Sequence, residues 1–339
     1  MNRTTAAVAA ALTALVALVS GCGSSTGTGG SGSTSKPGVA VFLSTSANSY
    51  EQAQAAGVKA AAKKLGAGRV QVFDGGFDST KQIGQIQDAT TSGRFKAFVI
   101  EPVDGNAAAA PLRRAAEQGI QVVCMTSACG PDATKIDTQF PKQAGVVASD
   151  YGKTAALMAQ RAIEACAGVD PCKVFYLNGD STFPSDRAAK DAFAATLKAG
   201  PGNVRLAGSQ DGKYDTATGR GVMQSELQRN PDVNVLVSFA DQQTLGAVQA
   251  IEAAGKTSAV KVISFGGSEQ GVAAVQAGSW YGAQLTMPFS IGETSATIAI
   301  ESAQGKKPAK TVVDANTLAP HSGFLTKADA AGFKAQWVS

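Results

Sequence analysis

The chain has 339 residues, 17% of them charged, and its formal net charge at neutral pH is +4. Basic residues are neither gathered into a run nor interleaved with aromatic ones, so nucleic-acid binding is not expected. After residue 19 no segment is long and apolar enough to cross a bilayer, and the single histidine, His321, has no partner nearby in the sequence.

The N-terminal residues predict an export signal rather than part of the fold. Arg3 supplies a positive start, and residues 6–19 form an apolar stretch whose one polar member is Thr13. A membrane-spanning helix needs roughly 20 apolar residues, whereas the apolar core of a signal peptide needs about 7–15. We therefore expect residues 1–21 to be a signal peptide.

The residues around Cys22 resemble a bacterial lipobox, in which an aliphatic residue and two small residues precede a cysteine. The sequence here is Val19-Ser20-Gly21-Cys22. The resemblance implies cleavage before Cys22 and attachment of lipid to that residue. The mature protein would then be anchored to the outer face of the cell membrane, outside the cytoplasm. The alternative is a cysteine that follows a cleavage site by chance.

Residues 22–36 predict a flexible tether, because residues 23–36 offer no apolar side chain that could be buried. The stretch GTGGSG at 27–32 matches the glycine pattern of dinucleotide-binding loops. That motif needs a strand before it and a helix after it, and neither is predicted here. We reject a nucleotide site and expect no cofactor.

The body of the chain, from Pro37 onward, alternates short apolar runs with helical patterns. In its first part we predict strands over 39–43, 70–73, 97–100 and 120–124, and helices over 50–65, 80–91 and 106–118. After about residue 150 we predict strands over 173–177, 204–207, 233–239, 260–265 and 282–286, and helices over 150–165, 186–197, 216–228, 241–254, 271–277 and 291–304. Strands without polar alternation are buried on both faces. The pattern therefore predicts an α/β protein of two doubly wound lobes, each with a parallel-sheet core.

Four cysteines besides Cys22 fall in two close pairs, Cys124 with Cys129 and Cys166 with Cys172. An exported protein meets an oxidising environment, so we expect each pair to form a local disulfide. Neither pair has the spacing of a zinc site, and no metal site is expected.

The order of these segments resembles that of the ribose-type periplasmic sugar-binding proteins, the substrate-binding components of ABC import systems. The resemblance runs from Pro37 to about Asp314. Its most telling stretches are FVIEPVDGNAAAAPLRRAAEQGIQVV at 98–123, VVASDYGKTAALMA at 146–159, and residues 230–266. It implies the type I periplasmic-binding-protein fold, with two lobes that close about three crossing hinge segments.

Laid on this chain, the crossings fall near Ser149, Thr286 and Asp314. The N-terminal lobe is then expected to comprise 37–149 plus 287–314, and the C-terminal lobe 150–286 plus 315–339.

Several ligand-binding positions of the family carry over to this sequence. Asn48 and Tyr50 match a polar residue and a stacking aromatic after the first strand, and Tyr214 matches another stacking aromatic. Arg187 matches an arginine whose guanidinium can grip two oxygens. The alternatives are a Tyr50 that packs at a helix start and an Arg187 that lies on the surface.

At other family positions the chain differs. Glu51 replaces an aromatic residue, Thr126 stands where an aspartate is usual, and Thr286 stands where a glutamine is usual. Asp241 keeps the family's acid, and Phe183 lies on a loop that faces the expected cleft. Either acid could instead favour a helix N-terminus, and Phe183 could belong to the core.

These replacements point to a changed ligand, because several groups that fix the hydroxyls of a pyranose are missing. Aromatic residues, an arginine, one or two acids and small hydroxyl side chains suit a modified sugar, a polyol or a small solute bearing a carboxylate. A non-sugar carboxylate or amine is the alternative.

We expect a monomer that captures a small polar solute between its lobes and delivers it to an ABC-type permease in the membrane. The alternative is a sensor subunit that presents the closed form to a membrane receptor. No GxSxG, HExxH or P-loop pattern occurs, so we expect no enzyme and name no catalytic residue.

Overall fold

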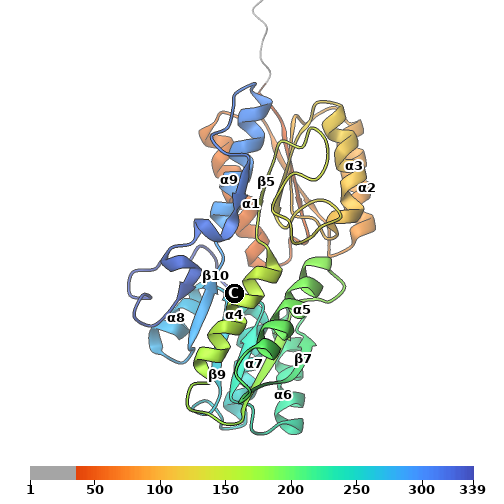
Figure 1. The fold of residues 1–339 in the computed structure, drawn as a ribbon. Helices are drawn as coiled ribbons and strands as arrows, with labels where there is room; N and C mark the ends of the chain where they lie inside the picture. The colour runs from red at the N-terminus through yellow and green to blue at the C-terminus, as the bar shows by residue number, and fades with distance from the viewer. Residues whose placement is uncertain (1–35) are drawn as a thin grey trace, which may run out of the picture. The chain divides into compact units, whose positions relative to one another are not determined.

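Two six-stranded sheets organise residues 36–339, the residues that the computed structural model describes (Figure 1). The predicted signal peptide, Cys22 and residues 23–35 of the predicted tether lie outside them. Among the described residues, no helix combines the length and the apolar character that a membrane span requires.

The first sheet is entirely parallel, with strand order β11-β5-β4-β3-β1-β2. Its strands are β1 (Val39–Leu43), β2 (Val70–Asp74), β3 (Ala97–Ile100), β4 (Gln121–Thr126), β5 (Gly145–Ala148) and β11 (Val312–Asp314). The runs VAVFL and AFVI are buried throughout because helices cover both faces.

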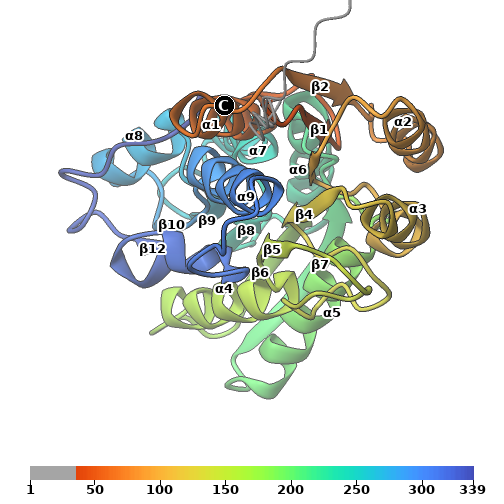
Figure 2. The ribbon, with the colours of Figure 1, turned by 90° about the horizontal axis from the view of Figure 1, so that it is seen from above.

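Helices α1 (Ser49–Lys64) and α9 (Pro288–Ala303) cover one face of this sheet. Helices α2 (Ser79–Thr91) and α3 (Gly105–Glu117) cover the other, as the view from above in Figure 2 shows. Alternate residues of one strand therefore enter different cores. Val41 packs in the core under α1 and α9, and Phe42 packs in the core under α2 and α3.

The second sheet has strand order β12-β10-β9-β8-β6-β7. Its strands are β6 (Cys172–Asn178), β7 (Val204–Asp211), β8 (Val235–Ser238), β9 (Lys261–Gly266), β10 (Gly282–Leu285) and β12 (Phe324–Leu325). All its pairs are parallel except β12 with β10. One face is covered by α4 (Tyr151–Ala165) and α5 (Pro184–Ala199). The other face is covered by α6 (Thr216–Arg229), α7 (Asp241–Ala253) and α8 (Glu269–Ala277).

The chain passes between the two sheets three times. It crosses from β5 to α4, from β10 to α9, and from β11 to β12 through two short 3-10 turns, η1 (Ala315–Leu318) and η2 (His321–Gly323). Each group of helices thus stays with its own sheet, and three short segments join two separate cores. This arrangement confirms the predicted fold class.

Both predicted disulfides are present. Cys124 within β4 is bonded to Cys129 in the following loop, and Cys166 at the end of α4 is bonded to Cys172 at the start of β6. Each bond closes a short loop beside a strand, so each fixes a local turn rather than linking the two cores.

Helices α1 and α9 cross closely because glycines stand at their contact. A Cβ atom added at Gly57 would lie 2.1 Å from the carbonyl oxygen of Phe289. One added at Gly292 would lie 2.1 Å from the carbonyl oxygen of Gln54. Neither helix can take a larger side chain there without moving, so the N-terminal end of α1 has a fixed place against α9.

We expect Gly57→Ala to lower the free energy of unfolding by about 1–3 kcal/mol, as overpacking of a tight interior does. Gly84→Ala in α2 is the matched control, because nothing lies within 4 Å of the added Cβ. That change should leave stability equal or raise it by roughly 0.5–1 kcal/mol. Urea unfolding of both variants measures the difference. Equal stability of the two variants would contradict the close helix crossing.

Candidate functional site

A pocket lies where loops at the carboxyl ends of strands from both sheets meet. It holds about 690 Å³ of space not filled by atoms, part of it open to solvent. Ser44, Glu101 and Thr126 reach it from β1, β3 and β4, while Gly266 and Thr286 reach it from β9 and β10. Open parallel sheets bind ligands at this edge.

Aromatic rings make up much of the pocket wall. They belong to Tyr50, Phe77, Tyr151, Phe183, Tyr214, Phe239, Phe265 and Trp337. The ring of Phe77, which follows β2, lies 5.6 Å from that of Phe183 and 6.2 Å from that of Tyr214. These two contacts join the first-sheet side of the pocket to the second-sheet side. Aromatic faces can pack on the CH groups of a sugar ring or attract a cation.

Backbone strain gathers around the pocket. Phe77, Thr126 and Tyr214 all have positive φ angles, of 57°, 68° and 56°. For a β-branched residue such as threonine this conformation is a genuine outlier. Strain of this kind concentrates at ligand sites, where the surrounding structure holds side chains in the orientation that binding needs.

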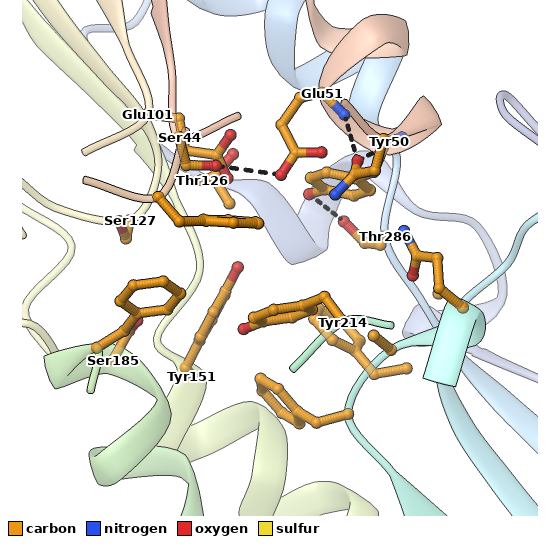
Figure 3. A pocket seen from close by; sticks show the side chains of 18 of the residues that line it. Ser44, Tyr50, Glu51, Glu101, Thr126, Ser127, Tyr151, Ser185, Tyr214 and Thr286 are labelled. Carbon is orange, nitrogen blue, oxygen red and sulfur yellow. Dashed lines mark hydrogen bonds between the residues drawn. The ribbon is translucent and has the colours of Figure 1, made fainter. Parts of the chain in front are cut away.

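Two carboxyl groups, Glu51 and Glu101, line the same part of the pocket (Figure 3), and we call them the acid pair. Glu51 stands in the first turn of α1 and is 5% exposed, whereas Glu101 follows β3 and is 8% exposed. The Ser44 hydroxyl donates a hydrogen bond of 3.1 Å to Oε1 of Glu51. The other carboxyl oxygen, Oε2, of each acid is buried and has no hydrogen-bond partner among the described residues.

Burial raises the pKa of both members of the acid pair, because it penalises the charged form. The pKa of Glu101 rises to about 8, although nearby Ser44 and Gln54 side chains oppose the rise. The pKa of Glu51 is raised well above its ordinary value by burial and then by the charge of Glu101. At neutral pH the pair therefore retains a proton. None of the residues that line the pocket is a lysine, an arginine or a histidine.

Seven of the nine predicted ligand residues line the pocket: Asn48, Tyr50, Glu51, Thr126, Phe183, Tyr214 and Thr286. The side-chain oxygen of Asn48 also caps α1, accepting from the backbone N–H groups of Tyr50 and Glu51. The Tyr50 hydroxyl lies 3.1 Å from the Thr286 hydroxyl. This contact ties the start of α1 to the crossing segment after β10.

The structure places the other two predicted residues elsewhere. The guanidinium of Arg187 donates to the carbonyl oxygens of Ser181 and Thr182, each at 2.9 Å. It borders an adjoining hollow rather than the pocket itself. Asp241 is fully buried, and its Oδ2 accepts from the backbone N–H groups of Gly267 and Ser268 and from the Ser268 hydroxyl. Local partners hold both side chains, and neither lines the pocket.

Among the pocket residues that the sequence did not predict are one acid, Glu101, and three aromatic residues, Phe77, Tyr151 and Trp337. Glu101 could have been predicted from its position directly after a buried strand, because ligands of parallel sheets bind at the carboxyl ends of strands. Phe77 and Tyr151 follow β2 and the first crossing, where no rule singles out a side chain. Trp337 arrives from the C-terminal tail, where its carbonyl oxygen accepts from the backbone N–H of Glu269 at 2.9 Å. Its ring lies 5.5 Å from that of Tyr50.

Metal binding finds no support in the described residues, because no group of three or more His, Cys, Asp or Glu side chains there is placed to hold an ion.

Comparison with known proteins places this geometry in context. The family model described as a periplasmic binding protein domain matches residues 39–307. The chain is 29% identical over 273 residues to the ribose import binding protein of Salmonella typhimurium, covering 80% of this chain and 86% of that protein. It is 26% identical over 274 residues to the ribose import binding protein of Bacillus subtilis, covering 81% and 84%.

Solved structures agree with the fold. An ABC transporter periplasmic solute binding protein from Actinobacillus succinogenes with bound D-allose has a TM-score of 0.76 at 20% identity. The match covers 88% of this chain and 100% of that one. A solute binding protein from Mycobacterium smegmatis with bound glycerol has a TM-score of 0.74 at 24% identity, covering 90% and 99%.

The acid pair predicts a pH dependence of stability. A carboxyl group whose pKa is raised by folding binds more protons in the folded state, so stability falls as pH rises. For Glu101 the loss accumulates between its ordinary value of 4.5 and about 8. We expect the ligand-free protein to lose on the order of a few kcal/mol over this window.

Urea unfolding at pH 5 and pH 8.5 (roughly the ends of that window) measures this loss. Glu101→Gln should lose much less stability than the wild type between the two pH values. Glu252→Gln, which changes an exposed acid on α7, should behave like the wild type. A full loss in Glu101→Gln would show that this carboxyl does not carry the effect.

Proposed function

Because the chain belongs to the family of periplasmic binding protein domains, we propose that it captures a small polyhydroxylated solute outside the cytoplasm and delivers it to an ABC-type import permease. The observation that carries the proposal is a pocket lined from both sheets by aromatic rings, carboxyl groups and hydroxyls. Relatives at 26–29% identity that are named ribose import binding proteins support a sugar, a modified sugar or a polyol.

We propose that the lobes comprise residues 37–149 with 287–314 and residues 150–286 with 315–339. The membership of the two sheets supports this division, since the chain changes sheet after β5, β10 and β11. Ligand contacts that come from both lobes favour the closed arrangement, so binding shifts the population from open to closed. The closed form is the one that the permease receives.

In this proposal the ligand touches Asn48, Tyr50, Glu51, Thr126, Phe183, Tyr214 and Thr286, together with Phe77 and Glu101. A carboxylate solute is disfavoured for two reasons. The arginine that would grip it is held by loop carbonyls outside the pocket, and the two buried acids would repel it.

We also propose that Cys22 carries a lipid that anchors the protein to the outer face of the cell membrane. The support is the sequence Val19-Ser20-Gly21-Cys22 after an apolar stretch, followed by a glycine- and serine-rich segment. The globular part would then remain near the permease.

Ligand capture is tested by a thermal-shift screen of residues 36–339 against pentoses, hexoses, amino sugars, inositols, polyols and sugar acids. A ligand at 100 times its Kd adds roughly 2.7 kcal/mol of stability, which raises Tm visibly. Phe77→Ala should weaken the ligand found by about tenfold, because its ring joins both sides of the pocket.

Leu206→Ala removes a side chain of the same exposure, 38%, outside the pocket and should leave affinity unchanged. A flat screen, or equal losses in the two variants, would contradict the proposed site.

Lipid anchoring is tested by expressing the full chain in a bacterium and partitioning the lysate between water and a detergent phase. The wild-type protein should enter the detergent phase and incorporate labelled palmitate, whereas Cys22→Ala should do neither. Ser24→Ala serves as the control and should behave like the wild type. A wild-type chain that stays in water without label would exclude the anchor.

A further inference from the structure

The pocket contains two buried acids and lacks a positive charge of its own. Neither member of the acid pair is more than 8% exposed, and no lysine, arginine or histidine lines the pocket. A buried carboxylate is costly unless it is paired with a cation or well supplied with hydrogen-bond donors. The pair therefore stays partly protonated until a ligand brings the missing charge.

The basic side chains on nearby loops are engaged elsewhere. Arg187 is bonded to loop carbonyls. Lys213, next to Tyr214, lies 2.7 Å from Asp180, and Lys81 in α2 lies 3.0 Å from Asp74. None of these three cations lines the pocket. The positive charge that would balance the acid pair must therefore come from the ligand.

The rings supply a second attraction for a cation. Electron-rich ring faces attract ammonium groups by roughly 0.5–2 kcal/mol, the more so away from water. Figure 3 shows the Tyr151 hydroxyl pointing toward the part of the pocket that holds Glu51 and Glu101. The free Oε2 of Glu51 is an unused acceptor there, and Asn48 and Thr286 add groups that suit hydroxyls.

We propose that the pocket selects solutes that carry a protonated amine on a polyhydroxylated frame, in preference to their neutral or acidic counterparts. The ammonium group donates to the free oxygen of Glu51 and neutralises the acid pair, while the rings pack on the carbon frame. This inference rests on the proposed capture function and narrows its ligand class.

Binding of such a solute is linked to release of a proton. Burial keeps both acids of the free pair largely protonated at neutral pH, and an ammonium group beside them favours the loss of one proton, so that one carboxylate balances one ammonium. The other titratable groups that face the pocket are Tyr50, Tyr151 and Tyr214, whose pKa values burial raises, so they stay protonated. Asp186 lies behind the Tyr214 hydroxyl, which donates to it at 2.6 Å. Burial raises the pKa of Asp186 to about 7, so its proton must be distinguished from that of the pair.

The test is isothermal titration calorimetry at pH 7 with matched probes. The pairs are D-glucosamine with D-glucose, D-galactosamine with D-galactose, and an aminodeoxyinositol with myo-inositol, and D-glucuronate is the acidic probe. At least one amine should bind at least about tenfold more tightly than its neutral partner. A single charge-assisted hydrogen bond contributes enough binding free energy for a difference of this size. Its binding heat should vary with the ionisation enthalpy of the buffer, as proton release requires.

Single-residue variants identify which side chains carry the amine preference and the proton release. Glu51→Gln should weaken the amine by about 10–100-fold and change its neutral partner by less than about threefold. Glu252→Gln, outside the pocket, should change neither. Glu101→Gln should reduce proton release, and Asp186→Asn should leave it unchanged. Release that is unchanged in Glu101→Gln and lost in Asp186→Asn would belong to Asp186 and would contradict the assignment to the acid pair.

The same titrations distinguish failure of the amine preference from failure of the proposed capture function. If a neutral sugar or D-glucuronate binds as tightly as the amines or more tightly, the amine preference is overturned and the capture function stands. If no probe of any class binds at millimolar concentration, both are overturned.

Discussion

Two carboxyl groups share a buried pocket without a cation beside them, and much of the site's behaviour follows from this constraint. A pair of acids shielded from water cannot both ionise cheaply, so the pair keeps a proton at neutral pH. The fold tolerates this arrangement because burial raises the pKa of both acids, so that the pair does not carry two charges, and because the Ser44 hydroxyl donates to Glu51. The same arrangement leaves unpartnered oxygens that a ligand can satisfy.

The surrounding architecture holds the acids in place. Glu101 follows a central strand buried on both faces, and Glu51 stands at the start of α1, which crosses α9 through glycine contacts. Because the crossing segments are short, residues that follow strands of the second sheet line the side of the pocket opposite the first sheet. Phe77 then meets Phe183 and Tyr214 across the pocket. Strained backbone at Phe77 and Tyr214 fits this account, because those rings need orientations that ordinary loops do not provide.

The sequence predicted the fold where burial leaves a local signature. Strands such as β1 and β3 are unbroken apolar runs, and their boundaries matched the structure. Three strands were missed. β5 has only four residues and follows a long loop, β11 has three residues with Val312 exposed, and β12 has two. Such short strands form because they pair with a neighbouring strand. Their own sequences are too short to carry a recognisable strand pattern.

The site was predicted in part for the same reason. Tyr50, Tyr214 and Thr286 were named because they match ligand positions of the family that the sequence resembles, and the topology gathers such loop residues at one edge of each sheet. Arg187 and Asp241 lie outside the pocket because they bond to loop carbonyls and loop N–H groups, and these partners are set by tertiary structure. Trp337 was missed because the C-terminal tail returns to α8 and α1 through contacts between residues far apart in the sequence.

The most direct test of this account is an infrared spectrum of the ligand-free protein carrying carbon-13-labelled glutamate at neutral pH. The account predicts the band of a protonated, labelled carboxyl group. That band should disappear at alkaline pH and be absent from the double variant Glu51→Gln with Glu101→Gln. A wild-type spectrum with only ionised carboxylate bands would show that both acids are charged without a ligand. That result would contradict the central claim that the acid pair stays protonated until a ligand supplies a positive charge.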